Sequence, residues 1–253
     1  EREKEYGKNF RFTLTTNGIL LNDEIMEFVN ENMHNVVLSL DGRKEINDML
    51  RVRADGSGCY DAIVPKYQKL IATRGDKDYY VRGTFTHYNL DFAKDVLHMV
   101  HMAELGFDQV SVEPVVSDPN LQYSLQEEDL PAAFAEYENL ANILIDRKKK
   151  GKGFNFFHFM IDLNQGPCAI KRLRGCGCGN EYVCVTPEGD IYPCHQFVGQ
   201  EKWKMGNIME DTFDIPMKQE FALTNVYSKE DCKDCWAKFY CSGGCAANSW
   251  QYE

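Results

Sequence analysis

The sequence is poorest in three features: long apolar runs, nucleotide-phosphate motifs and, over its first 167 residues, cysteine. No run approaches the ~20 apolar residues that span a bilayer, and no secretion signal is visible. Neither a Gly-x-Gly-x-x-Gly nor a phosphate-loop motif occurs, so ordinary dinucleotide or nucleoside triphosphate binding has no motif support. We therefore expect a cytoplasmic protein without a membrane partner.

Basic residues are also in deficit, because 28 Lys and Arg face 39 Asp and Glu, for a net charge of −11. Such a surface disfavours nonspecific binding to nucleic acid or to anionic membranes. The one basic run, residues 147–152, closes a predicted helix, where cations suit the helix dipole. Hydrophobic residues make up 43% of the chain, with 15 Phe and 13 Tyr, which predicts a folded protein with a substantial core.

The ten cysteines are distributed very unevenly. Only Cys59 lies in the first 167 residues, and the other nine fall between residues 168 and 245. In a chain without a secretion signal, such cysteines indicate metal or redox chemistry before disulfides. The asymmetry also predicts two domains, 1–165 and 166–253.

The first part alternates β-rich runs with amphipathic runs. The predicted strands are Arg11–Thr16, Val36–Leu40, Tyr80–Thr86 and Gln109–Glu113, and the predicted helices are 23–33, 60–72, 91–104 and 127–149. Strand–helix alternation with short loops predicts an α/β fold with a parallel sheet, open or closed into a barrel. In such sheets the functional residues lie at the carboxyl ends of the strands, where this chain has polar residues and glycines.

The second part is rich in glycine and shows no long periodic run. One hairpin is predicted, from Tyr182–Val185 through a Pro187-Glu188-Gly189-Asp190 turn to Ile191-Tyr192. A segment with so little visible core needs another source of stability, and metal–thiolate bonds can supply it.

The last cysteines follow a compact pattern, Cys232-x2-Cys235-x5-Cys241-x3-Cys245. Two-residue spacing lets a pair of thiolates reach one metal centre, and Ser242-Gly243-Gly244 gives the backbone freedom to aim a further sulfur elsewhere. Structural zinc is a weaker alternative, because Cys194 and Cys232 are 38 residues apart while zinc pairs lie ~15–20 residues apart. A disulfide scaffold is weaker still. Three cysteines fall outside the pattern and are interpreted as buried or tolerated thiols: Cys59, Cys178 and Cys184.

The whole order resembles the SPASM domain of radical S-adenosylmethionine (SAM) enzymes: Cys176, twelve residues, Gly189, four residues, Cys194, a gap, and then the compact pattern. The resemblance implies two auxiliary [4Fe–4S] clusters with interleaved ligands. It assigns Cys176, Cys194 and Cys245 to a first cluster, with Cys168 as possible fourth ligand, and Cys232, Cys235 and Cys241 to a second. If Cys168 is no ligand, the first cluster has an open iron site. The family's last cysteine has no counterpart before residue 253.

The first part resembles the later four strands of the radical SAM partial barrel. The family's three-cysteine loop for the catalytic cluster and its glycine-rich loop do not occur in this sequence. The resemblance therefore implies a fragment whose catalytic cluster lies outside this chain and which by itself does not cleave SAM. It predicts a Cys-x3-Cys-x2-Cys loop before residue 1 and a further cysteine after residue 253. The positions that match SAM-facing ones are Asn17, Ser39, Asp41, Arg82 and Val115. Asn17 and Asp41 also suit turns, and Arg82 also suits a surface ion pair.

The string Tyr192-Pro193-Cys194-His195-Gln196-Phe197-Val198-Gly199 is similar to maturases of six-cysteine (SCIFF) peptides. The resemblance implies an enzyme that forms thioethers from cysteine sulfur to carbon in a ribosomally made, cysteine-rich precursor peptide. It also implies a reductant such as flavodoxin or ferredoxin. His195 stands where anaerobic sulfatase maturases typically have an aspartate base, and it is a candidate catalytic residue or a packing residue. The alternatives are another radical SAM modification, such as sulfatase maturation, or a non-catalytic iron–sulfur or zinc-binding module.

Overall fold

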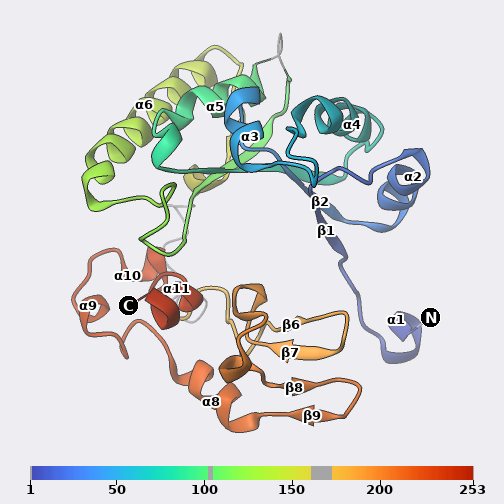
Figure 1. Ribbon diagram of the computed structural model, residues 1–253, viewed down its shortest axis with the longest axis vertical. Helices are drawn as coiled ribbons and strands as arrows, with labels where there is room; N and C mark the ends of the chain where they lie inside the picture. Colours follow the sequence, from blue (N-terminus) through green and yellow to red (C-terminus); the bar gives the residue numbers. More distant parts are fainter. Residues whose placement is uncertain (1, 102–104, 161–172, 253) are drawn as a thin grey trace. The chain divides into compact units, whose positions relative to one another are not determined.

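The computed structural model describes residues 2–101, 105–160 and 173–252. The chain divides into two compact units, Glu1–Ile161 and Asp162–Glu253 (Figure 1). The domain boundary predicted near residue 165 lies outside the described residues. In the part of the chain that is described, no helix is both long enough and apolar enough to cross a bilayer.

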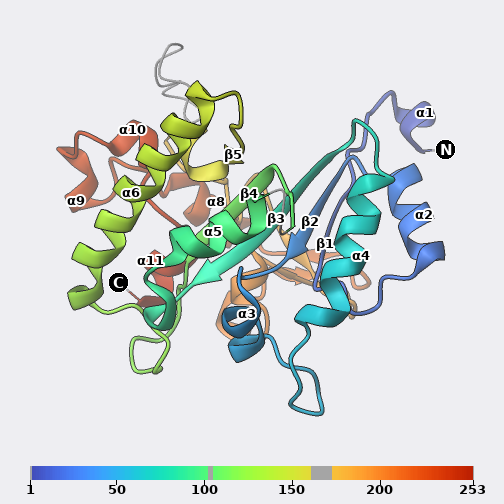
Figure 2. The same cartoon turned by 90° about the horizontal axis from the view of Figure 1, so that it is seen from above.

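The first unit is built on a five-stranded sheet in which every neighbouring pair is parallel, in the order β1-β2-β3-β4-β5 (Figure 2). The strands are β1 (Thr13–Thr16), β2 (Asn35–Ser39), β3 (Asp78–Phe85), β4 (Gln109–Pro114) and β5 (Asn155–Phe156). The helices are α1 (Arg2–Tyr6), α2 (Asp23–Asn32), α3 (Lys44–Leu50), α4 (Tyr60–Ala72), α5 (Phe92–Val100) and α6 (Leu130–Lys149). Short 3-10 turns are η1 (His87–Asn89), η2 (Glu127–Asp129) and η3 (Phe157–Phe159).

The predicted parallel α/β fold is confirmed, and the structure adds two elements to it. The fifth strand, β5, is only two residues long and has no alternating pattern that would reveal it. Helix α3 lies between the predicted strand Val36–Leu40 and the predicted helix 60–72, where no element was predicted. Its buried residue is Asn47, so it lacks the apolar pattern that would reveal it. The Asn47 side chain accepts a hydrogen bond from the Asp41 N–H at 3.3 Å, so a polar contact anchors this helix.

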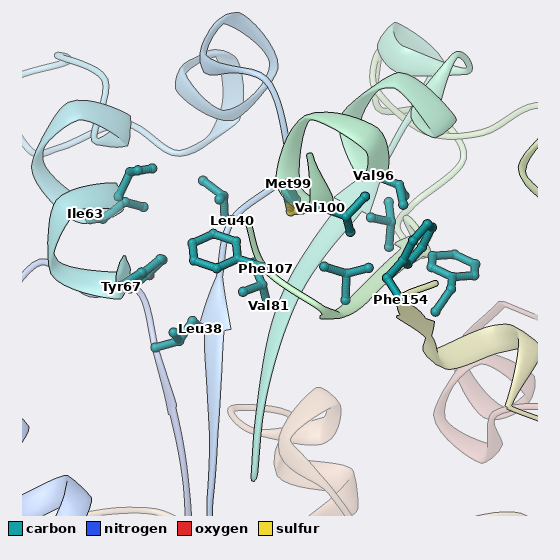
Figure 3. Packing of buried hydrophobic residues seen from close by; sticks show 14 of the residues in the cluster. Leu38, Leu40, Ile63, Tyr67, Val81, Val96, Met99, Val100, Phe107 and Phe154 are labelled. Atoms are coloured by element: carbon teal, nitrogen blue, oxygen red, sulfur yellow. The ribbon is translucent and has the colours of Figure 1, made fainter. Parts of the chain in front are cut away.

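One face of this sheet is covered by helices and forms the core. Residues that alternate along the strands, such as Leu38, Val81 and Val110, are fully buried against α2, α4, α5 and α6. Figure 3 shows part of this packing, with Ile63 and Tyr67 of α4 facing Leu38 and Leu40. The alternate residues of the same strands therefore lie on the opposite, open face of the sheet.

The second unit contains a four-stranded antiparallel sheet in the order β6-β7-β8-β9 (Figure 1). Its strands are β6 (Cys184–Val185), β7 (Asp190–Tyr192), β8 (Gly206–Asn207) and β9 (Thr212–Phe213). The remaining elements are η4 (His195–Phe197), η5 (Glu201–Trp203), α8 (Ile215–Leu223), α9 (Glu230–Lys233), α10 (Lys238–Cys241) and α11 (Ala246–Tyr252). The predicted hairpin is confirmed, since Cys184 pairs with Tyr192 across a turn that holds Gly189 at φ +91°.

Candidate functional site

Two of the predicted SAM-facing residues lie in one row across the open face of the first unit's sheet. The strand register pairs Ser39 of β2 with Arg82 of β3, and Arg82 with Ser111 of β4. Their neighbours Leu38, Val81 and Val110 face the core, so the row faces the other way. The Arg82 side chain is 56% exposed, which leaves its guanidinium accessible to an anionic group.

Three further predicted residues follow the strands at the sheet's carboxyl edge. Asn17 comes directly after β1, and its Oδ1 accepts a hydrogen bond from the Ile19 N–H at 3.2 Å, closing a turn. Val115 follows β4, and its N–H donates to the Phe85 carbonyl oxygen at 2.8 Å. Because the strands are parallel, these positions share one edge with Asp41, which follows β2.

Asp41 has a full set of partners within the fold. The residue is 4% exposed, and Arg51 binds both of its carboxylate oxygens, at 2.7 and 2.8 Å. The Thr84 N–H also donates to Asp41 Oδ1, at 2.8 Å. These contacts tie the end of α3 and strand β3 to the end of β2. Asp41 therefore has a clear structural task, and a direct contact to SAM stays a prediction.

The structure adds a hydrogen-bonded network beside Arg82 that the sequence did not reveal. Glu113 of β4 lies two residues beyond Ser111, in register with Thr84 of β3, and its Oε2 is 2.6 Å from His158 Nε2. His158 Nδ1 is 2.9 Å from the Tyr137 hydroxyl on α6, and the Ser111 hydroxyl donates to Glu113 Oε1. Arg82 Nε is 4.0 Å from the same Oε1. Only Glu113's place at a strand end was visible in the sequence, because its partner His158 is 45 residues away.

The charges in this network follow from its contacts. Burial raises the pKa of Glu113, but the hydrogen bonds from His158 and Ser111 outweigh burial, and the net pKa is lowered. Burial and the nearby Glu113 charge raise the pKa of Tyr137, so its phenol keeps its proton. At neutral pH the network therefore presents a fixed carboxylate next to the Arg82 guanidinium.

The second unit holds eight of the nine described cysteines, and all nine are free thiols. Cys59 alone lies in the first unit, where it is buried and accepts a hydrogen bond from the Asn47 side chain at 3.4 Å, as expected of a core thiol. The predicted ligand Cys168 lies outside the described residues. Within them, no three His, Cys, Asp or Glu side chains are grouped tightly enough to hold a single metal ion.

Segments with predicted ligands of the first cluster converge in the second unit. Cys194 is buried in one small cluster with Cys178, which sequence reasoning had set aside. The Gln196 side-chain amide donates to Cys245 Sγ at 3.8 Å. A Cβ on Gly175, beside Cys176, would lie 3.5 Å from the Gly244 carbonyl oxygen, so the backbones that carry Cys176 and Cys245 are neighbours.

The thiols of Cys178 and Cys194 differ sharply in acidity. A hydrogen bond from Cys178 lowers the pKa of Cys194, and the backbone N–H of Gln196 and the charge of His195 lower it further. The same hydrogen bond raises the pKa of Cys178, and burial and the charges of Cys194, Cys176 and Cys245 raise it further. Within this pair the hydrogen bond favours the thiolate on Cys194 over that on Cys178. His195 itself is exposed on η4.

The predicted ligands of the second cluster follow each other along α9 and α10. The Cys235 N–H donates to the Cys232 carbonyl oxygen at 3.3 Å, and the Cys241 N–H donates to Ala237 at 2.8 Å. Three consecutive left-handed residues come next, Ser242, Gly243 and Gly244, with φ of +61°, +80° and +74°. This reversal separates Cys245 from the preceding three cysteines, in keeping with their assignment to different clusters.

The donor set suits iron–sulfur clusters. A [4Fe–4S] cluster is held by four cysteine thiolates, each bound to a different iron atom. The ligands of a cluster therefore lie farther apart than the ligands of a single metal ion. Residues 176–236 match the SPASM family, an iron–sulfur cluster-binding domain. The second unit thus carries such a domain, and iron–sulfur clusters are its cofactor class, as predicted.

Similarity extends along almost the whole chain. The cysteine-type anaerobic sulfatase-maturating enzyme of Clostridium perfringens is 24% identical over 258 residues, which cover 97% of this chain and 67% of that protein. The serine-type enzyme of Bacteroides thetaiotaomicron is 26% identical over 271 residues, covering 98% and 64%. This chain thus spans about two thirds of the length of these curated relatives.

Two solved structures share the fold. Native anSMEcpe with bound AdoMet aligns with a TM-score of 0.75 at 22% identity, covering 97% of this chain and 68% of that one. Streptococcus suis SuiB bound to its precursor peptide SuiA aligns with a TM-score of 0.57 at 19% identity, covering 93% and 55%. The fold therefore resembles that of these structures, with a parallel α/β unit followed by a unit that matches the SPASM domain, as the sequence predicted.

Proposed function

We propose that the protein acts in radical SAM chemistry that modifies a cysteine-rich peptide by forming thioether crosslinks. Two observations on one chain support this enzyme class. Residues 176–236 match the SPASM family, and the parallel sheet belongs to a fold that an AdoMet-bound structure shares. The support for thioether formation is the sequence string around Cys194 and His195. SAM and reduced clusters, when bound, supply the radical and electron chemistry. The residues of the chain bind and orient these cofactors and shield them from water.

The first unit supplies the SAM contacts in this proposal. Arg82 presents a guanidinium to the carboxylate of the methionine part, and the Ser39 hydroxyl lies beside it in the same register row. Asn17 and Asp41 lie along the same sheet edge, and Val115 offers an apolar surface to the adenine. Glu113, fixed by His158 and Ser111, limits where the Arg82 side chain can settle.

The second unit holds the auxiliary clusters. In the proposal Cys176, Cys194 and Cys245 bind the first cluster, with Cys168 as its possible fourth ligand. Cys232, Cys235 and Cys241 bind the second. His195 follows a ligand directly and is exposed, so it can face a peptide sulfur or accept its proton. The peptide partner and a flavodoxin- or ferredoxin-type reductant belong to the same proposal.

Sulfatase maturation is the second candidate. It is favoured by the named curated relatives, which are anaerobic sulfatase-maturating enzymes of the cysteine and serine types. It is disfavoured by His195, which replaces the aspartate typical of that class after the cluster cysteine. SuiB, whose structure shares the fold and contains the precursor peptide SuiA, supports a peptide substrate instead.

The two candidates separate in one assay. The protein, produced from its full open reading frame and reconstituted anaerobically, is incubated with SAM, flavodoxin and either a cysteine-rich precursor peptide or a sulfatase-derived peptide. Thioether formation predicts that the cysteine-rich peptide loses two hydrogen atoms and one alkylatable thiol per crosslink. Modification of the sulfatase peptide alone selects the second candidate, and cleavage of SAM without a change in either peptide rejects both.

A further inference from the structure

Gln196 contacts the predicted first cluster's ligands from both its side chain and its backbone. Its side-chain Nε2 donates to Cys245 Sγ at 3.8 Å, within reach of a hydrogen bond to sulfur. Its backbone N–H donates a hydrogen bond to the sulfur of Cys194. The two sulfurs are 51 residues apart in the sequence, and a single residue thus interacts with both.

The position of Gln196 is itself fixed by two other glutamines. Gln251 of α11 donates through Nε2 to the Gln196 carbonyl oxygen at 3.1 Å, and Gln200 donates to the same oxygen at 3.4 Å. Phe197, the next residue, is fully buried among Trp203 and Phe221. The exposed amide of Gln196 is therefore held against Cys245 by a buried neighbour on one side and by α11 on the other.

Cys194 and Cys245 differ in their need for such help. Cys194 is buried and packed in the unit's core, whereas Cys245 is exposed to solvent. An exposed thiolate is reached by water, and its hydrogen bonding is undefined unless a protein donor is fixed beside it. Gln196 supplies such a donor to Cys245 Sγ.

We propose that Gln196 is a positioning residue that sets the reduction potential of the first auxiliary cluster through N–H···S hydrogen bonds. This inference rests on the proposed function, because it requires Cys194 and Cys245 to bind that cluster. A reduced cluster carries one more negative charge than an oxidised one, so a donor to a ligating sulfur stabilises the reduced form more. Gln196 therefore raises the potential and makes the cluster a better electron acceptor.

The test measures the potential of the first cluster alone. The 253-residue chain, which has no three-cysteine loop for a catalytic cluster, carries Cys232→Ala and Cys235→Ala to remove the second cluster, and it is reconstituted anaerobically. Iron and acid-labile sulfide are measured first, and the potential then follows from a redox titration monitored by electron paramagnetic resonance. Gln196→Leu removes the side-chain donor. Gln196→Glu removes it and adds a negative charge near the sulfur.

We expect Gln196→Leu to disfavour reduction by about fivefold, as for loss of one hydrogen bond, which is roughly 40 mV more negative for a one-electron couple. Gln196→Glu shifts the potential further in the same direction. The matched control is Gln68→Leu, which removes a glutamine amide that donates to the Leu105 carbonyl oxygen in the first unit, and it leaves the potential unchanged.

The outcomes distinguish this inference from the proposed function. Wild-type protein without sulfide contradicts the proposed function itself. If the wild-type protein holds a cluster whose potential is the same in Gln196→Leu, or is shifted equally in Gln68→Leu, the role of Gln196 alone is overturned. If Gln196→Leu fails to retain iron, the Gln196→Glu variant, which keeps the side-chain length, supplies the measurement, and an unchanged potential in it is equally decisive against the inference.

Discussion

The core of the first unit is continuous, whereas that of the second is small and packs around two cysteines. In the first, buried aliphatic and aromatic side chains extend across the strands and into α2, α4, α5 and α6 (Figure 3). In the second, Phe197, Trp203 and Phe221 pack around Cys178 and Cys194. Hydrophobic burial can stabilise the first unit by itself, but the second has little apolar area to remove from water. One of its core residues, Cys194, is also a proposed cluster ligand.

The two units differ in whether the same residues serve both stability and function. The first unit can place polar residues on its open sheet face, because the helices on the other face supply the stability. The second unit uses one set of residues both for folding and for function. Changes at its cysteines should therefore disturb structure and cofactor together, while changes on the open face of the first unit should not.

Removal of iron should have the largest effect. Because cluster binding contributes to the folding of the second unit, anaerobic chelation should abolish amide-exchange protection across residues 173–252. The first unit, measured in the same sample, serves as the internal control and should keep its protection. Hydrogen exchange read by mass spectrometry gives both values. Full protection of the second unit without iron would show that its small core suffices.

Phe92→Ala should be the most damaging single change in the first unit. Phe92 is fully buried, with its ring centroid 4.3 Å from that of Phe85 and 4.8 Å from that of Tyr137. Loss of the ring should lower the unfolding free energy of this unit by about 3–5 kcal/mol. Denaturant unfolding checks the value, and iron content should not change. Phe157→Ala is the control, since Phe157 is 54% exposed and should cost far less.

Asp41→Asn should cost somewhat less, about 2–4 kcal/mol, because it leaves Arg51 without its bidentate partner at a largely buried site. Asp23→Asn is the control. It breaks the exposed Asp23–Lys69 pair, whose Asp23 side chain is 81% exposed, and should change stability by less than about 1 kcal/mol. Thermal unfolding of the first unit compares the two. Equal effects would show that Asp41 has no special structural task.

The smallest effect should be the pH dependence that Glu113 contributes. Its folded-state pKa is lowered, so the unfolded state binds the proton more tightly. The resulting stabilisation is present above the unfolded pKa of about 4.3 and is lost as pH falls through the folded pKa. Glu113→Gln should flatten the acid limb of the unfolding free energy of the first unit. An unchanged acid limb in this variant would show that Glu113 does not contribute to the pH dependence of stability.

Much of the fold could be predicted from the sequence because its signals are local. The alternation of strands and helices and the hairpin that ends in Tyr192 each show in short runs of residues. Helix α3 and strand β5 could not be predicted, since one is anchored by the polar Asn47 and the other is two residues long. Their formation depends on tertiary contacts.

The candidate sites could be predicted only where the spacing of residues along the sequence reveals them. The cysteine pattern and the left-handed turn at Ser242-Gly243-Gly244 are properties of one stretch of chain. The network of Glu113 and His158, the pairing of Asp41 with Arg51 and the contact of Cys178 with Cys194 join distant segments. Such pairs have no periodicity, and only the folded chain brings them together.

The central claim is that the second unit is an iron–sulfur unit, and analysis of iron, zinc and acid-labile sulfide after anaerobic reconstitution tests it most directly. The account predicts iron and sulfide in equal amounts, up to roughly eight of each per chain for two [4Fe–4S] clusters. It also predicts a loss of about half of each in the Cys194→Ala, Cys245→Ala double variant, with the Cys184→Ala variant unchanged. Bound zinc with no sulfide would contradict the account.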